Sequence, residues 1–356
     1  MPTFYSIPMT PPVQRKRENL FWIDLLRAVV SFGVIMIHVS ADVITEWGVL
    51  PQDWWWAANI EDSLVRGCVP VFVMVSGALL LPIQEDFQDF FRKRLYRVMI
   101  PFIAWTLLYL LWKKHFYEPD LGGAEALRRI AGSGVHFHLW FLYILIGLYL
   151  VTPLFRIWAA HASGRDIFYF LALWLFVSSF LPRLPFRIQI PIEPAQGFIG
   201  YFVLGHFLRQ YAIEKWIPGA RALWAASLLV CVIGTAFLSA RSHAFQSLFY
   251  DNLSPNVIFY TASFFILAKY AGPVFEKQLP FHLRSLVLSL SKASFGIYLI
   301  HPMILDALAK GRWGIVLKAD MLHPVVMIPF TAAAIYFLSF AVIWVIQKIP
   351  YLKKIT

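Results

Sequence analysis

The chain has 356 residues, of which 59% are hydrophobic and only 14% are charged. Soluble globular domains carry about 25% charged residues, so this composition excludes an ordinary soluble domain. The formal net charge is +11. The basic residues sit in short loops between long apolar runs, and membrane topology explains this distribution better than a nucleic-acid-binding surface does.

A membrane span needs about 20 mainly apolar residues, and ten segments of the chain meet this rule. We predict helices, because only helices and closed barrels satisfy the backbone in lipid, and these runs are too long for barrel strands. The approximate bounds are 20–44, 62–82, 95–116, 136–157, 165–181, 196–213, 219–240, 255–271, 284–307 and 323–347. The sequence therefore predicts an all-α polytopic transmembrane bundle, with an N-terminal arm at 1–19, a membrane domain at 20–347 and a tail at 348–356.

Lys and Arg are distributed unequally between the two sides of the predicted membrane. With the N-terminus inside, the inner segments hold 18 of them and the outer loops hold 10. This excess predicts that both termini are cytoplasmic. The outer loop 113–135 is unusually basic, and its flanking glycines predict a short surface helix. The first span exceeds a signal-peptide core of about 15 apolar residues, so we expect it to be retained.

The first span carries a stripe of polar residues on one face. At 100° per residue, Arg27 and His38 lie within about 20° of each other and roughly 16 Å apart along the helix axis. Ser31 and Asp42 share this face, and Asp24 lies one turn before Arg27. A titratable residue inside a membrane marks a candidate functional site, and histidine suits general base catalysis near neutral pH. His38 is therefore the main candidate for chemistry.

Part of the stripe has a simpler interpretation. Asp24 and Arg27 can pair locally near the inner interface, with Arg27 reaching towards water. Asp42 can be the solvated end of the helix, or it can hold the His38 ring in one tautomer. His38 is about 18 residues into the helix, beyond the middle of the bilayer. Neither a local ion pair nor a solvated helix end therefore explains a histidine at this position.

Further polar residues fall on the two predicted sides of the membrane. The outer half holds Asn59, Arg66, His136, His138 and His301, which we expect to converge with His38. The inner side holds Arg92, Lys93, Arg94, Arg97 and Lys292. These cations either follow the positive-inside rule or bind the phosphates of a cytoplasmic cofactor. No HxxxH or HExxH spacing is present, and the two cysteines form no zinc motif, so no metal is expected.

Six segments in order resemble the acyltransferase-3 family of membrane O-acyltransferases. The segment 23–27 followed by His38 is similar to the family's Arg-x10-His motif. The other five are 66–77, 94–101, 138–142, 200–205 and 294–301. The chain is most similar to the short, single-domain branch, such as the O-acetyltransferase of enterobacterial common antigen. The family moves acyl groups, most often acetyl from acetyl-CoA, to hydroxyls of cell-envelope glycans, in the bacterial inner membrane.

The resemblance implies a role for each candidate residue. His38 would act as general base or acyl relay, with Arg27, Arg66 and Asp42 assisting it. Acyl-CoA would be held by Arg92, Arg94, Arg97 and Lys292. The acceptor would be bound by Asn59, His138, Trp140, Tyr298 and His301. The implied partners are acyl-CoA, a carbohydrate acceptor, membrane lipid and polysaccharide-assembly enzymes, with no nucleic acid.

Two other functions fit ten helices with polar residues inside. One is a transporter or exporter of a glycan or an acyl group. A transporter favours paired repeats of broken helices, whereas Pro70, Pro101 and Pro302 interrupt spans without a repeat relationship. The other is a non-catalytic partner in an envelope-polysaccharide assembly complex.

Overall fold

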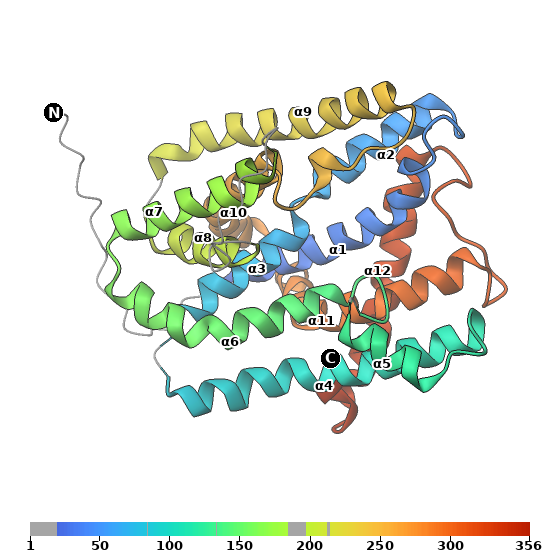
Figure 1. Cartoon of the computed structure of the whole chain (residues 1–356), viewed down its shortest axis with the longest axis horizontal. Helices are drawn as coiled ribbons and strands as arrows, with labels where there is room; N and C mark the ends of the chain where they lie inside the picture. Colours follow the sequence, from blue (N-terminus) through green and yellow to red (C-terminus); the bar gives the residue numbers. More distant parts are fainter. Residues whose placement is uncertain (1–19, 84, 133, 184–196, 212–213) are drawn as a thin grey trace.

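The computed structural model describes residues 20–356 except 84, 133, 184–196 and 212–213, so the predicted N-terminal arm at 1–19 lies outside the described residues. In the described part, every regular element is a helix (Figure 1). This agrees with the predicted all-α bundle.

Twelve α-helices follow one another along the described chain. They are α1 (Phe21–Ile44), α2 (Gln52–Val65), α3 (Cys68–Leu80), α4 (Phe87–Phe116), α5 (Gly123–Ala131), α6 (Trp140–His161), α7 (Gly164–Leu175), α8 (Ile199–Gln210), α9 (Ile217–Ser242), α10 (Pro255–Gln278), α11 (Phe281–Ala309) and α12 (Pro324–Lys348). Short helical turns include η1 (Phe176–Phe180), η2 (Leu181–Arg183), η4 (Glu214–Trp216), η5 (Leu248–Tyr250) and η6 (Leu352–Ile355).

Nine helical segments among the described residues are long and apolar enough to cross a membrane. The predicted span at 196–213 is not one of them, because α8 has 12 residues and is only about 18 Å long. A bilayer core is about 30 Å thick. The predicted count of ten therefore exceeds the observed candidates by one, and the cytoplasmic placement of the termini stays a prediction.

Two helix boundaries differ from the prediction in ways that matter for function. The second span is broken into α2 and α3 at Arg66 and Gly67. Helix α4 begins at Phe87 rather than near residue 95, with the Asp86 side chain accepting a hydrogen bond from the Gln88 backbone at 2.9 Å. Hydropathy missed this start because the first turns of α4 are strongly charged. The predicted surface helix in the outer loop is confirmed as α5.

Helix α1 packs against α2, α3, α10, α11 and α12. Two contacts fix its register with α11. The Ser291 hydroxyl donates a hydrogen bond to Asp24 at 2.6 Å, and the His301 ring stacks on His38. Both pairs increase in residue number together, so α1 and α11 run parallel. The polar stripe of α1 is therefore matched by polar residues of α11 at two levels.

Helix α8 is short but is held tightly against α3. A Cβ atom added to Gly77 would lie 1.8 Å from the Phe202 carbonyl oxygen, and one added to Gly205 would lie 2.0 Å from the Met74 carbonyl oxygen. Small residues allow helix backbones to approach this closely. Arg209 adds a hydrogen bond to the Ala78 carbonyl at 2.6 Å. These contacts explain why the segment around Gly205 forms a stable helix without crossing the bilayer alone.

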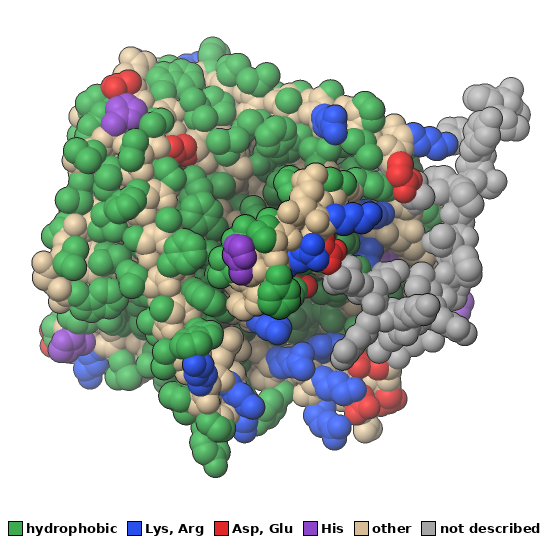
Figure 2. Space-filling model, turned by 180° about the vertical axis from the view of Figure 1, so that it is seen from behind, with side chains coloured by type: hydrophobic (Ala, Val, Ile, Leu, Met, Phe, Trp, Pro, Cys, Tyr) green, Lys and Arg blue, Asp and Glu red, His purple; other side chains and the backbone are tan. Residues whose placement is uncertain are grey.

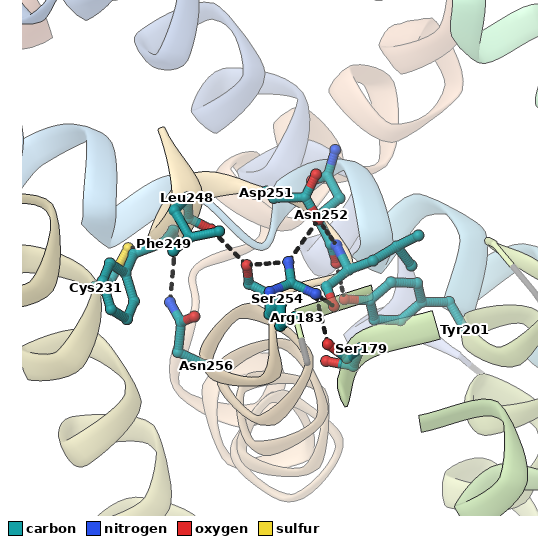
Figure 3. A network of polar contacts seen from close by, with 11 residues as sticks. Ser179, Arg183, Tyr201, Cys231, Leu248, Phe249, Asp251, Asn252, Ser254 and Asn256 are labelled. Atoms are coloured by element: carbon teal, nitrogen blue, oxygen red, sulfur yellow. Dashed lines mark hydrogen bonds and ion pairs between the residues drawn. The ribbon is translucent and has the colours of Figure 1, made fainter. Parts of the chain in front are cut away.

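A separate polar network joins the end of α7 to the connection between α9 and α10 (Figure 3). The Arg183 guanidinium donates to the Ser179 carbonyl at 2.6 Å, to the Ser254 hydroxyl at 2.7 Å and to the Asp251 carboxylate at 3.3 Å. Hydrogen bonds from a charged donor are stronger than neutral ones. The network fixes these chain ends relative to each other.

The surface separates apolar from basic side chains. Figure 2 shows a largely apolar face, with Lys and Arg side chains gathered mainly towards its lower right. Large exposed apolar side chains lie on the outer helices, among them Leu111 of α4, Leu154 of α6 and Phe237 of α9. Such a surface suits lipid contact around the bundle and water contact at its basic end.

Candidate active site

Four histidines from three parts of the chain lie together. The His38 and His301 ring centroids are 5.3 Å apart and their planes differ by 21°. The His301 ring lies 5.7 Å from that of His138, whose Nδ1 is 3.0 Å from the Nδ1 of His136. The structure thus brings together these four residues, which the sequence analysis assigned to the outer half of the membrane.

The loop before α6 is fixed against α4 and α11. The Tyr298 hydroxyl donates a hydrogen bond to the His138 carbonyl. The Tyr109 hydroxyl donates to the Leu299 carbonyl at 2.8 Å, and the Tyr109 ring lies 4.4 Å from the His136 ring. The side chain of Tyr298 therefore holds the backbone at His138, so two of the predicted acceptor-binding residues are in contact.

The hydrogen bond of His301 defines its tautomer. Its Nδ1 lies 2.7 Å from the Tyr298 carbonyl oxygen, which can only accept, so Nδ1 carries the proton in the neutral ring. The Nε2 atom is buried and has no hydrogen-bond partner among the described residues. His301 therefore presents an unused lone pair beside His38.

His38 is half-buried, whereas His301 is fully buried. Asp42 is exposed near the C-terminal end of α1, within electrostatic reach of Asp320, Lys318 and Lys310. The contacts to the His38 ring come instead from His301 and Phe137. Among the described residues, no hydrogen bond between Asp42 and His38 therefore supports the orienting role predicted for Asp42.

Arg66 lies at the break between α2 and α3 and is already paired. It forms an ion pair with Asp62, and its guanidinium lies 4.2 Å from the centre of the Tyr250 ring. Asp62 also accepts a hydrogen bond from Ser40 of α1 at 2.6 Å. Arg66 is within electrostatic reach of His38. Arg66 thus joins α2 to η5, and its partner Asp62 links the pair to α1.

Asn59 and Trp140 make packing contacts away from the histidine rings. The Asn59 amide donates to the Val232 carbonyl at 3.0 Å and accepts from the Tyr250 hydroxyl at 2.5 Å. The Trp140 ring lies 5.6 Å from the Phe198 ring. The amide of Asn59 is thus already used to link α2 to α9 and η5.

Basic residues gather at the opposite end of the polar stripe. Tyr149 of α6 lies within electrostatic reach of Arg27, Arg94 and Arg97, which come from α1 and α4. Arg27 and two of the predicted phosphate-binding residues are therefore on the same side of the bundle, around Tyr149. Sequence analysis missed Tyr149, which is one aromatic residue in a run of apolar ones.

Glu85 is the carboxylate of this basic cluster. It lies 3.2 Å from Arg156, 3.5 Å from Arg94 and 3.5 Å from Lys93. Burial would raise the pKa of Glu85, but its hydrogen bond from Arg156 and the nearby Arg94 outweigh this and hold the pKa below its usual value. Arg156 also donates to the Leu80 carbonyl at 2.9 Å. Glu85 thus joins the connection between α3 and α4 to α6.

The other residues that the sequence predicts on the inner side have different surroundings. Arg92 is exposed and pairs with Asp89 at 3.4 Å. Lys292 is exposed on α11, next to Ser291. Asp24 has Ser291 as its hydrogen-bond partner, which gives it an alternative to the expected local pair with Arg27. Arg27 lies within electrostatic reach of Asp24 and Tyr149.

The C-terminal ends of α4 and α11 are held together by a network of polar contacts. Asp306 accepts hydrogen bonds from Trp112 at 3.0 Å, from Arg312 at 2.9 Å and from Tyr117. The Arg312 guanidinium lies 3.9 Å from the centre of the Phe116 ring. This network fixes the part of α4 that carries Tyr109.

The histidine rings stack or tilt against one another. No three His, Cys, Asp or Glu side chains in the described ranges are arranged to hold a metal ion. What the cluster offers is a set of imidazole rings that can take up and release protons.

The chain matches the model of a protein family described as an acyltransferase domain over residues 20–348. The chain belongs to the acyltransferase-3 family. No curated protein and no solved structure matches the chain. Family membership and the apolar helical bundle together identify a membrane acyltransferase. The finer similarity of this acyltransferase to the O-acetyltransferase of enterobacterial common antigen stays a prediction.

Proposed function

We propose that the protein transfers an acetyl or other short acyl group from cytoplasmic acyl-CoA to a hydroxyl of a cell-envelope glycan. The observation that carries this proposal is the arrangement of α1. The helix is unbroken over Phe21–Ile44, with Arg27 beside a basic cluster and His38 beside three other histidines. The two residues are roughly 16 Å apart along the axis, by the rise of an α-helix. Donor and acceptor would meet between them.

The donor end suits a polyanion. Arg27, Arg94 and Arg97 are all within electrostatic reach of Tyr149, and Arg156 and Lys93 form ion pairs with Glu85. Arg and Lys are the usual partners of phosphate groups. We assign the phosphates of acyl-CoA to this cluster, with the acyl thioester extending along the polar face of α1.

In the proposed reaction, His38 removes the proton from the acceptor hydroxyl, and the oxygen attacks the thioester carbonyl carbon. The carbon–sulfur bond breaks, the ester forms, and CoA leaves as a thiolate that takes up a proton. Arg66, which is within electrostatic reach of His38, would stabilise negative charge on the carbonyl oxygen, whereas Arg27 stays with the phosphates at the donor end. A variant of this route passes the acyl group through a covalent acyl-histidine at His38.

The test is an assay of the detergent-purified protein with acetyl-CoA and an envelope-glycan extract. Free CoA should appear, and His38→Ala should lower its release by about 10²- to 10⁴-fold, the usual contribution of a general base. His161→Ala is the matched control, since His161 is exposed at the end of α6. Undiminished CoA release from His38→Ala would refute the mechanism, and a glycan transporter would release no CoA at all.

A further inference from the structure

Phe137 touches the proposed catalytic base and is exposed. Its ring centroid lies 4.8 Å from that of His38 and 4.4 Å from that of His136. Phe137 is 54% exposed, whereas His301, whose ring stacks on His38, is 0% exposed. One face of His38 is thus closed by a buried residue, and a second contact is made by a ring that an incoming molecule can reach.

The backbone around Phe137 is fixed. Val135 and His138 are each 1% exposed, and Leu139 is 0% exposed. The Tyr298 hydroxyl binds the His138 carbonyl, and the Leu139 backbone N–H donates to the His136 carbonyl at 3.0 Å. The exposure of Phe137 therefore follows from its position in a packed loop, since Val135, His138 and Leu139 around it are buried.

Exposed single apolar residues are common and need no explanation by themselves. Phe137 differs because its ring makes an edge-to-face contact with His38, with the two ring planes 60° apart. An aromatic face offers a flat apolar surface for the C–H face of a ring-shaped molecule, at a low entropy cost because the side chain has two rotatable bonds. It also excludes water from one side of the base.

We propose that Phe137 is the acceptor-side entrance and binding platform of the site, and that the acceptor is a molecule with an apolar ring face, such as a pyranose. The acceptor packs on Phe137 and thereby brings one hydroxyl to His38. This inference rests on the proposed acyl transfer and adds to it the route and the face by which the acceptor approaches. Phe137 is a positioning residue in this scheme, because it takes no part in proton transfer.

The two native cysteines, Cys68 and Cys231, are both buried, so a new cysteine at position 137 can be labelled selectively. In Phe137→Cys, a membrane-impermeant maleimide added to the outer face should react. Labelling should lower acetyl-CoA-dependent CoA release with the glycan extract by about tenfold or more relative to the same variant unlabelled. Trp313→Cys is the matched control, because Trp313 is 56% exposed in the loop after α11. Its labelling should leave CoA release unchanged.

A second pair of variants separates positioning from packing. Phe137→Ala should raise the extract concentration that gives half-maximal rate while leaving the acetyl-CoA KM unchanged, and Phe137→Tyr should restore the parent value. The inference is overturned if the thiol of Phe137→Cys does not react, if its labelling leaves CoA release unchanged, or if Phe137→Ala saturates like the parent. If the unmodified protein releases no CoA, the proposed function itself fails, which is a different result from normal release by the labelled variant.

Discussion

The imidazole rings of His38 and His301 lie nearly parallel, with centroids 5.3 Å apart, and join the C-terminal half of α1 to α11. The same two helices are joined near the N-terminus of α1 by the hydrogen bond from Ser291 to Asp24. The polar stripe of α1 therefore faces a second polar helix rather than lipid. This arrangement explains how charged and titratable residues are tolerated inside the bundle.

His301→Gln should lower the maximal rate of CoA release, because it removes the ring that covers His38. An aromatic contact of this kind contributes about 0.5–1.5 kcal/mol, which corresponds to about a 2- to 10-fold change in rate. The acetyl-CoA KM should not change, since the donor cluster is distant. His282→Gln serves as control, because His282 is exposed at the start of α11. A maximal rate equal to that of the parent protein would show that His301 does not contribute to the active site.

The double substitution of Arg94 and Arg97 to Gln should weaken acetyl-CoA binding. Each hydrogen bond to a charged group contributes about 1.5–3 kcal/mol, so a loss of about tenfold or more in affinity is expected. Equilibrium binding to the detergent-purified protein measures it. Arg221→Gln is the matched control, since Arg221 is exposed in the first turns of α9 and is not among the predicted donor-binding residues. If the double variant binds as tightly as the parent, these residues only determine topology.

Gly77→Ala should destabilise the protein, because the added Cβ would lie 1.8 Å from a carbonyl oxygen of α8. Overpacking of this kind costs about 1–3 kcal/mol. The thermal unfolding midpoint in detergent should fall. Gly147→Ala is the control, because a Cβ there meets no atom within 4 Å. Equal midpoints for the two variants would show that α3 and α8 are not in backbone contact.

Glu85→Gln should lower stability at neutral pH, because it removes the carboxylate that joins Arg94 and Arg156. The pKa of Glu85 is held below its ordinary value in the folded protein. Its contribution is therefore complete above its unfolded pKa of about 4.3 and is lost as the pH falls through the folded value. The difference in unfolding midpoint between parent and variant should shrink over that acidic range. A difference that does not depend on pH would mean that the charge of Glu85 is unimportant.

The sequence by itself determined that the chain is a helical membrane protein, because lipid requires long apolar segments and every backbone group must be paired within them. It also determined that Arg27 and His38 share a face of α1, because helical periodicity depends only on spacing. Motif order then indicated the acyltransferase-3 family, which the match over residues 20–348 confirms.

The tertiary structure decided which distant residues meet. Hydropathy selected 196–213 as a span, but only the close packing around Gly77 and Gly205 shows that α8 is a short helix held by α3. Tyr149 and Phe137 carry no sequence signal, because their importance comes from neighbours on other helices. Periodicity places residues on a face of one helix, whereas the pairing of His38 with His301 depends on how α1 and α11 pack, and that packing is a property of the whole bundle.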